Sequence, residues 1–169
     1  SFGLPHQLLQ NSWDVMSEGY DYCHLATHPI YGCLGQHTVA YHKDRLGWIA
    51  PAQKYVATLG SQARIVLQQL ALPNGAGLMA QIPIPRSTTR FYTVEARRFA
   101  SYDVKLPGQA VIIHEIDTSR GDWARLIDAD GNGNSGDAGA MWIVGETFSD
   151  DANGISVSID AETATGFLV

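Results

Sequence analysis

From residue 53 onward, short runs rich in β-branched and aromatic residues alternate with turn-forming residues, and this pattern limits the possible folds most. Turn signals at Pro73-Asn74-Gly75, Pro107-Gly108 and Asn153-Gly154 separate several runs. Such spacing is typical of antiparallel β proteins, so we expect a β-sandwich or a small barrel. The expected strands are Lys54–Thr58, Ala63–Leu70, Gly77–Ile84, Arg90–Arg97, Ala110–Asp117, Trp123–Asp128, Gly154–Asp160 and Thr163–Val169.

A helix is expected before this β-rich region, over residues 36–47. Val39 and Leu46 lie two turns apart on one side of it, and Gly47 fits the left-handed position that ends a helix. The change of pattern places a soft boundary near residue 52. We therefore expect a mainly β chain with a short α-containing N-terminal part, divided into residues 1–52 and 53–169.

Composition excludes some classes of function. Hydrophobic residues make up 45% of the 169 residues, so a folded core is expected. The formal charge is −6 and the chain has no run of Lys or Arg, which argues against nucleic-acid binding. No apolar stretch is long enough to predict a membrane span.

Three blocks of sequence carry a family resemblance. The first holds Gly3, His6 and the tetrapeptide Asp14-Val15-Met16-Ser17, and the second is H-K-D-R-L-G-W at residues 42–48. The third block is in the β-rich region. It reads F-Y-T-V-E-A-R, Y-D-V-K-L-P-G and A-V-I-I-H-E-I-D. Together the blocks cover most of the chain, and they resemble secreted metzincin-type zinc peptidases of the immune-inhibitor-A and gametolysin-like kind.

The metzincin signature is H-E-x-x-H-x-x-G-x-x-H followed by a Met-turn. The resemblance implies that His6 is the third zinc ligand, Gly3 the glycine of the signature and Met16 the apolar floor beneath the metal. The chain also begins without a methionine, so H-E-x-x-H, with its general-base glutamate, is expected immediately before Ser1.

The resemblance thus implies the C-terminal piece of a metzincin catalytic domain followed by an antiparallel β-sandwich-like domain. The parent protein is expected to be a secreted zinc endopeptidase that hydrolyses protein or peptide substrates with a zinc-activated water. This chain, without the N-terminal half of the catalytic domain, is expected to be inactive alone. Tyr20 is a candidate catalytic residue, although it follows the methionine by four residues, whereas the tyrosine of some metzincins follows it by two. A packing role for Tyr20 is the alternative.

Cys23 and Cys33 enclose a short loop. A disulfide between them would fit a secreted enzyme. Two free thiols are one alternative. Another is a zinc site with His24, His28 or His37, although this spacing matches no standard ligand pattern.

A second metal is suggested by an Asp/Asn/Gly loop at residues 128–137. Its start fits D-x-[DN]-x-[DN]-G, but Gly139 stands where an EF-hand needs a glutamate. A calcium-binding β-loop and a metal-free polar turn are both compatible with it. The candidate ligands are Asp128, Asp130, Asn132, Asn134 and Asp137, with Asp150 and Asp151 as further candidates.

The rival interpretation is a non-catalytic β-sandwich module, stabilised by calcium, that binds protein or carbohydrate. A hydrolase with another nucleophile has less support, because the chain has no G-x-S-x-G elbow. Glu95 could suggest a catalytic carboxylate. We expect it instead to form a buried network with Arg97 or Arg98.

Overall fold

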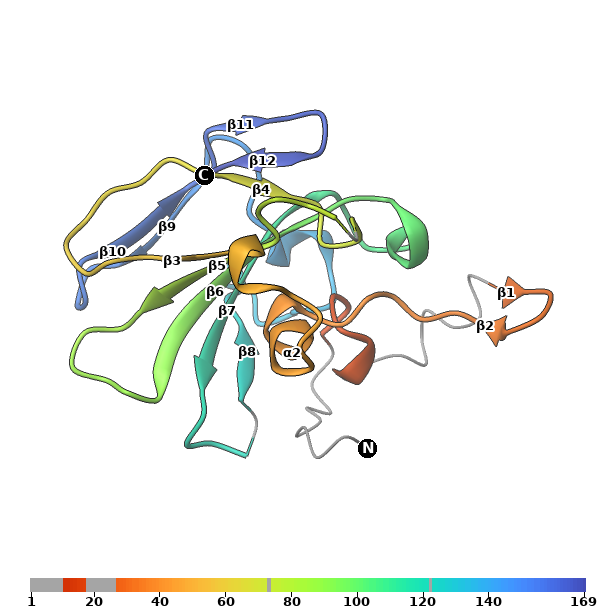
Figure 1. The fold of residues 1–169 in the computed structure, drawn as a ribbon, viewed down its shortest axis with the longest axis horizontal. Coiled ribbons are helices and arrows are strands. Elements are labelled where there is room, and N and C mark those ends of the chain that lie inside the picture. The colour runs from red at the N-terminus through yellow and green to blue at the C-terminus, as the bar shows by residue number, and fades with distance from the viewer. Residues whose placement is uncertain (1–10, 18–26, 73, 122) are drawn as a thin grey trace.

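The computed structural model describes residues 11–17, 27–72, 74–121 and 123–169 (Figure 1). Strands account for 33% of residues and helices for 12%, which confirms the mainly β expectation. Among the described residues, no helix is long and apolar enough to cross a membrane.

The largest sheet has five strands in the order β3-β5-β6-β7-β8. The two central strands match their expected ranges, and they pair antiparallel along their whole length. One pairing departs from the antiparallel expectation, because β3 runs parallel to β5. Between these two strands the chain leaves the sheet to form β4, so it returns in the same direction. The strands are β3 (Lys54–Val56), β5 (Met79–Pro83), β6 (Arg90–Arg97), β7 (Ala110–Asp117) and β8 (Ala124–Leu126).

A second β layer covers one face of this sheet. It consists of an antiparallel β9–β10 hairpin and a three-stranded sheet in the order β11-β12-β4. The sequence did not predict β9, because Phe148 is its one large apolar residue and the flanking residues are polar. The bounds are β4 (Val66–Gln68), β9 (Thr147–Asp150), β10 (Ile155–Ser158), β11 (Ala161–Glu162) and β12 (Gly166–Leu168).

The main hydrophobic core lies between the two layers. Val94 and Ile113 are opposed on β6 and β7, and both pack in a cluster with Phe148, Val157 and Phe167 of the second layer. Side chains alternate along a strand, so their neighbours in sequence face the opposite side of the sheet. That opposite face carries Thr93, Glu95, Arg97 and His114, all of which are fully buried.

Helix α2 (Ala40–Arg45) covers this opposite face, and it is shorter than the helix expected over residues 36–47. Val39 is extended, with φ −64° and ψ 157°, and so the helix cannot begin before it. The backbone of His37 is instead engaged in tertiary hydrogen bonds, donating to Asp103 and accepting from Arg97. The expected end is confirmed, because Gly47 has φ +75°.

Residues on both sides of position 52 share a hydrophobic cluster. Ala40 and Ile49 pack with Leu70, Leu78 and Met79. The division into two domains at that position stays a prediction.

The remaining described elements are short. A hairpin of β1 (Thr27–His28) and β2 (Gly32–Cys33) extends away from the rest of the chain (Figure 1). Three 3₁₀ helices complete the fold: η1 (Pro51–Gln53), η2 (Ser101–Asp103) and η3 (Ala138–Ala140).

Candidate functional site

Residues 15–17, which contain Met16, form one helical turn where the resemblance implied a non-helical Met-turn. Asp14 precedes this helical turn, called here the Met16 turn, and anchors it to the segment before α2. Its carboxylate accepts a hydrogen bond from the Met16 amide at 3.0 Å and from Thr38 Oγ1 at 2.7 Å. His42 Nδ1 lies 3.1 Å from the other carboxylate oxygen. Burial acts to raise the pKa of Asp14, but the hydrogen bond and charge of His42, with the bonds from Thr38 and Met16, hold this pKa below its ordinary value. The carboxylate is therefore ionised at neutral pH and fixes this turn against α2.

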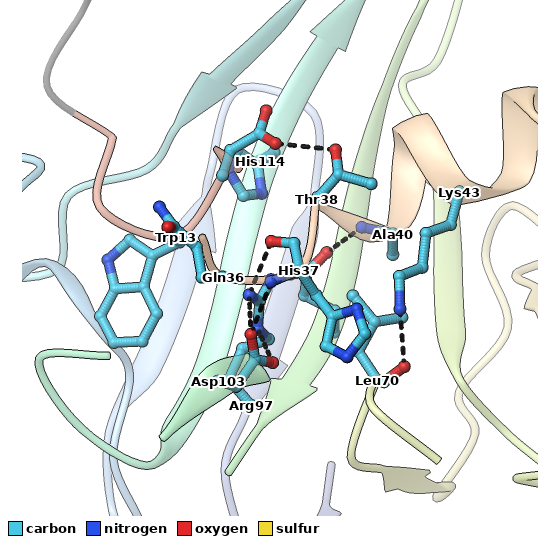
Figure 2. Close-up of polar contacts among 12 residues, drawn as sticks. Trp13, Gln36, His37, Thr38, Ala40, Lys43, Leu70, Arg97, Asp103 and His114 are labelled. Carbon is cyan, nitrogen blue, oxygen red and sulfur yellow. Dashed lines mark hydrogen bonds and ion pairs between the residues drawn. The ribbon is translucent and has the colours of Figure 1, made fainter. Parts of the chain in front are cut away.

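Arg97 is the centre of a fully buried ion network beside this turn (Figure 2). Its Nε and Nη2 donate to the two oxygens of Asp103 at 3.0 and 2.9 Å, and its Nη1 donates to Glu95 at 2.8 Å. Nη2 also donates to the His37 carbonyl at 3.0 Å. The expected Glu95–Arg97 pair is confirmed. Arg98 instead pairs with Glu162.

Glu95 connects this network to the start of α2, where its second oxygen accepts a hydrogen bond from the Ala40 amide. Burial raises the pKa of Glu95 above its ordinary value, although Arg97 acts in the opposite direction. Lys43 completes the cluster, and its Nζ donates to the Leu70 carbonyl at 3.0 Å. Burial and the charge of Arg97 lower the pKa of Lys43 to about 8. Two acidic and two basic side chains thus balance each other in the interior.

His114 of β7 is fully buried. Asn11 Nδ2 is 3.1 Å from His114 Nε2. The Asn11 oxygen is engaged by the Trp13 amide, so the NH₂ group faces the ring and Nε2 accepts. His114 Nδ1 then carries the proton and has no partner among the described residues. Trp13 Nε1 and Thr93 Oγ1 are also buried without a partner among those residues. Three buried side chains thus keep unused hydrogen-bonding capacity within the described part of the chain.

The buried state of His114 predicts a loss of stability in mild acid. Burial lowers its pKa from 6.5 to about 3, with Asp14 opposing and His42 and Arg97 reinforcing the shift. Between these values the unfolded chain binds a proton that the folded chain does not. The free energy of unfolding should therefore fall by about 1.4 kcal/mol per pH unit as the pH drops below about 6.5. Urea unfolding of wild type and His114→Gln should show a shallower pH slope for the variant, and equal slopes would contradict this account.

Several predicted residues lie outside the described part of the chain. These are Gly3, His6, Tyr20, Cys23 and His24. The predicted site residues that the structure describes lie in different elements. Met16 is half-buried in the turn held by Asp14, and Cys33 ends β2. His28 Nδ1 accepts hydrogen bonds from the Ile30 and Tyr31 amides, while His37 contacts the Tyr102 ring. The disulfide and the alternative zinc site stay predictions.

The Asp/Asn/Gly loop brings its predicted ligands together but closes on itself. Asn132 Nδ2 lies 2.9 Å from Asp130 and 3.2 Å from Asp137, so an amide NH₂ group stands between two carboxylates. Asp128 Oδ2 accepts from the Gly133 amide at 2.7 Å, whereas its Oδ1 is buried without a partner among the described residues. Gly133 has φ +83°, as the D-x-[DN]-x-[DN]-G pattern requires at its glycine.

The further candidate Asp150 is engaged elsewhere, by the Tyr92 hydroxyl and Asn153. Within the described ranges, no group of three His, Cys, Asp or Glu side chains is arranged to hold a metal ion. In this arrangement the three aspartates of the loop do not converge on one point, and a cation would require the Asn132 amide to turn its oxygen inward.

Sequence reasoning missed Thr38 and Asp103 as members of the site. Thr38 falls in the range predicted as helix, and Asp103 lies in a loop with no motif of its own. A signal existed for the partner of Asp103, because Glu95 and Arg97 stand at alternate positions in the expected strand β6. Comparisons with protein-family models, curated protein sequences and solved structures found no match.

Proposed function

We propose that this chain is part of a secreted zinc-dependent endopeptidase of the metzincin type. His6 would be the third zinc ligand, Gly3 the glycine of the signature and Met16 the floor under the metal. The two other ligands and the general-base glutamate would belong to an H-E-x-x-H segment immediately before Ser1. The substrate would be a protein or peptide.

The observation that carries this proposal is the contact between the three blocks of the resemblance. Asp14 of the first block pairs with His42 of the second. Glu95 of the third block accepts from the Ala40 amide at the start of the same helix. Asp103, also of the third block, accepts from the His37 amide. Three segments that resemble such a peptidase are thus linked by buried polar contacts, and this linkage supports the proposal.

The described residues would act by positioning. Asp14 fixes the backbone of Met16, and the ion network of Arg97 fixes the helix to which Asp14 is bonded. Zinc, when bound, would polarise a water molecule for attack on the peptide carbonyl. The half-buried Met16 would supply a poorly solvated floor, which strengthens electrostatic interactions above it.

Zinc content tests the proposal before any activity is measured. Protein carrying the residues encoded before Ser1 should contain stoichiometric zinc, and His6→Ala should lose most of it. His28→Ala, in the β1–β2 hairpin, is the matched control and should keep its zinc. A different motif before Ser1, or equal zinc content in the two variants, would contradict the proposal.

A second candidate is a calcium-stabilised β module that binds protein or carbohydrate without hydrolysis. Asp128 Oδ1 favours it, because this buried carboxylate oxygen has no hydrogen-bond partner among the described residues, which is costly, and a cation would satisfy it. Asp130 and Asp137 lie within the same loop, and their oxygens are held by amide groups that carry partial positive charge.

Calcium at about a hundred times its dissociation constant should stabilise the chain by about 2.7 kcal/mol if the loop binds it. Thermal unfolding with calcium, with magnesium and with a chelator measures this. Asp128→Asn should abolish the calcium-dependent rise in Tm, whereas Asp160→Asn, outside the loop and paired with Arg64, should retain it. No rise in wild type and no heat in a calorimetric titration would remove the calcium hypothesis and leave a polar turn.

A further inference from the structure

A slot of about 750 Å³ lies at the edge of the second β layer, away from the Met16 turn. One wall is the loop of residues 57–65, which leads from β3 to β4, and the other is formed by residues 153–158, which include β10. The loop passes around the outer end of the β9–β10 hairpin (Figure 1). The volume of the slot falls within the range of pockets that hold ligands.

The β10 wall presents backbone groups that have no strand partner. The Ile159 amide donates to the Glu146 carbonyl at 3.0 Å, so the backbone groups of Ile159 point to the side of β9. Because the direction of backbone groups alternates along a strand, those of Ser156 and Ser158 face away from β9. In the described chain β10 pairs with β9 alone, and the slot is lined by β10 but not by β9. The slot therefore lies along the open edge of β10.

The opposite wall is also unpaired. Residues 62–64 of the loop have no helix or strand assignment, and among the described residues their backbone amides and carbonyls form no hydrogen bond. Loop residues 58–64 are exposed. Within the described ranges, two lines of unpaired backbone groups thus border one slot, and a strand edge with such groups is a template for another strand.

β12 shows what fits between these two walls. At one end of the slot, the Asp160 amide donates to the Leu168 carbonyl at 2.9 Å. On the other side, Ile65 and Val169 exchange hydrogen bonds of 2.8 and 2.9 Å. At this end the walls are separated by the width of one strand. β12 runs antiparallel to β4, and its end lies between both walls.

The apolar floor of the slot and the pairing of its charged residues limit which ligands can bind there. Ala80, Ile82 and Val94 of the five-stranded sheet form an apolar floor. The charged lining residues, Arg64 and Asp160, pair with each other at 3.0 Å. A ligand that satisfies both walls needs backbone donors and acceptors on two sides, apolar groups facing the floor and no requirement for charge.

We propose that this slot binds one extended segment of a partner polypeptide, which adds as a strand in line with β12 and antiparallel to β10. Its backbone would pair with Ser156 and Ser158 on one side and with Gln62–Arg64 on the other. Alternate side chains would be apolar, because every second one faces the floor. This site is separate from the proposed zinc site and does not depend on it.

Fluorescence anisotropy with a labelled peptide of alternating valine and serine tests the proposal on the purified chain. The peptide should bind saturably. A peptide of identical side chains with alternate backbone nitrogens methylated should bind about tenfold more weakly or not at all, because it lacks donors along one edge. Equal binding of both peptides would overturn strand addition, since the side chains alone would then account for the affinity.

Matched variants place the binding in the slot. Ser156→Pro removes an outward amide from β10, and Ala63→Trp fills the slot from the loop wall. Each should weaken binding by about tenfold or more. Ala152→Trp, an exposed alanine just outside the lining, should bind as wild type does. Unchanged binding by both slot variants, with wild-type Tm values, would overturn the assignment of the site.

Two further outcomes distinguish the source and the direction of the strand. Association of the chain with itself, detected by sedimentation and lost in Ser156→Pro, would replace the partner polypeptide with a second copy. Joining the valine–serine sequence directly after Val169 should raise Tm and abolish binding of the free peptide. An unchanged Tm with undiminished binding would contradict placement in line with β12.

Discussion

Arg97→Met is expected to lower the free energy of unfolding by about 3–5 kcal/mol, the largest effect of any single substitution proposed. The change removes four hydrogen bonds and leaves Glu95 and Asp103 buried without their cation. Removal of one partner from a buried ion network is costly because the remaining charges cannot be hydrated. Urea unfolding followed by tryptophan fluorescence measures the loss.

Arg90→Met is the matched control for this prediction. Arg90 also pairs with a glutamate, Glu115, at 2.8 Å, but its side chain is 45% exposed. An exposed pair contributes about 0–1 kcal/mol, so this variant should unfold almost as wild type does. Similar losses for the two arginine variants would show that the buried network does not stabilise the fold in the way its geometry indicates.

Asp14→Ala is expected to cost about 3 kcal/mol. It leaves the Met16 amide and Thr38 Oγ1 without their acceptor and removes the partner of His42. The pKa of Asp14 is held below its ordinary value, so its contribution is present above about pH 4 and is lost as the pH falls through the folded value. The difference between wild type and variant should therefore be full at neutral pH and should shrink in strong acid.

Asp44→Ala tests whether the effect is specific to the turn. Asp44 lies in α2 and pairs with Lys54 at 2.8 Å, with both side chains partly exposed. This pair is expected to contribute less than about 1 kcal/mol. If Asp14→Ala were no more destabilising than Asp44→Ala, the Met16 turn would not be anchored by its aspartate.

The central sheet was predictable because its strands carry strong local signals. The middle of β6 is aromatic and β-branched, β7 is rich in valine and isoleucine, and the observed bounds of both strands equal the predicted ones. The end of α2 was also predictable, since Gly47 adopts the left-handed conformation that its position requires. In these places local preference and tertiary contacts favour the same structure.

Other parts of the fold depend on contacts that no local pattern reports. The predicted start of α2, at residue 36, was wrong because Asp103 and Arg97, which are distant in sequence, bind the backbone of His37. The parallel pairing of β3 with β5 depends on the path of the chain through β4. The pairing of Glu95 with Arg97 was expected from two charges in a buried strand, whereas Asp103 and Thr38 join the site only through the tertiary fold.

Hydrolysis of a quenched fluorescent peptide library, by protein that carries the residues encoded before Ser1, tests the zinc peptidase proposal most directly. The account predicts cleavage that a zinc chelator abolishes and added zinc restores, loss of cleavage in His6→Ala, and retained cleavage in His28→Ala. Cleavage that survives both the chelator and His6→Ala, or a zinc-loaded protein that cleaves no peptide, would contradict it.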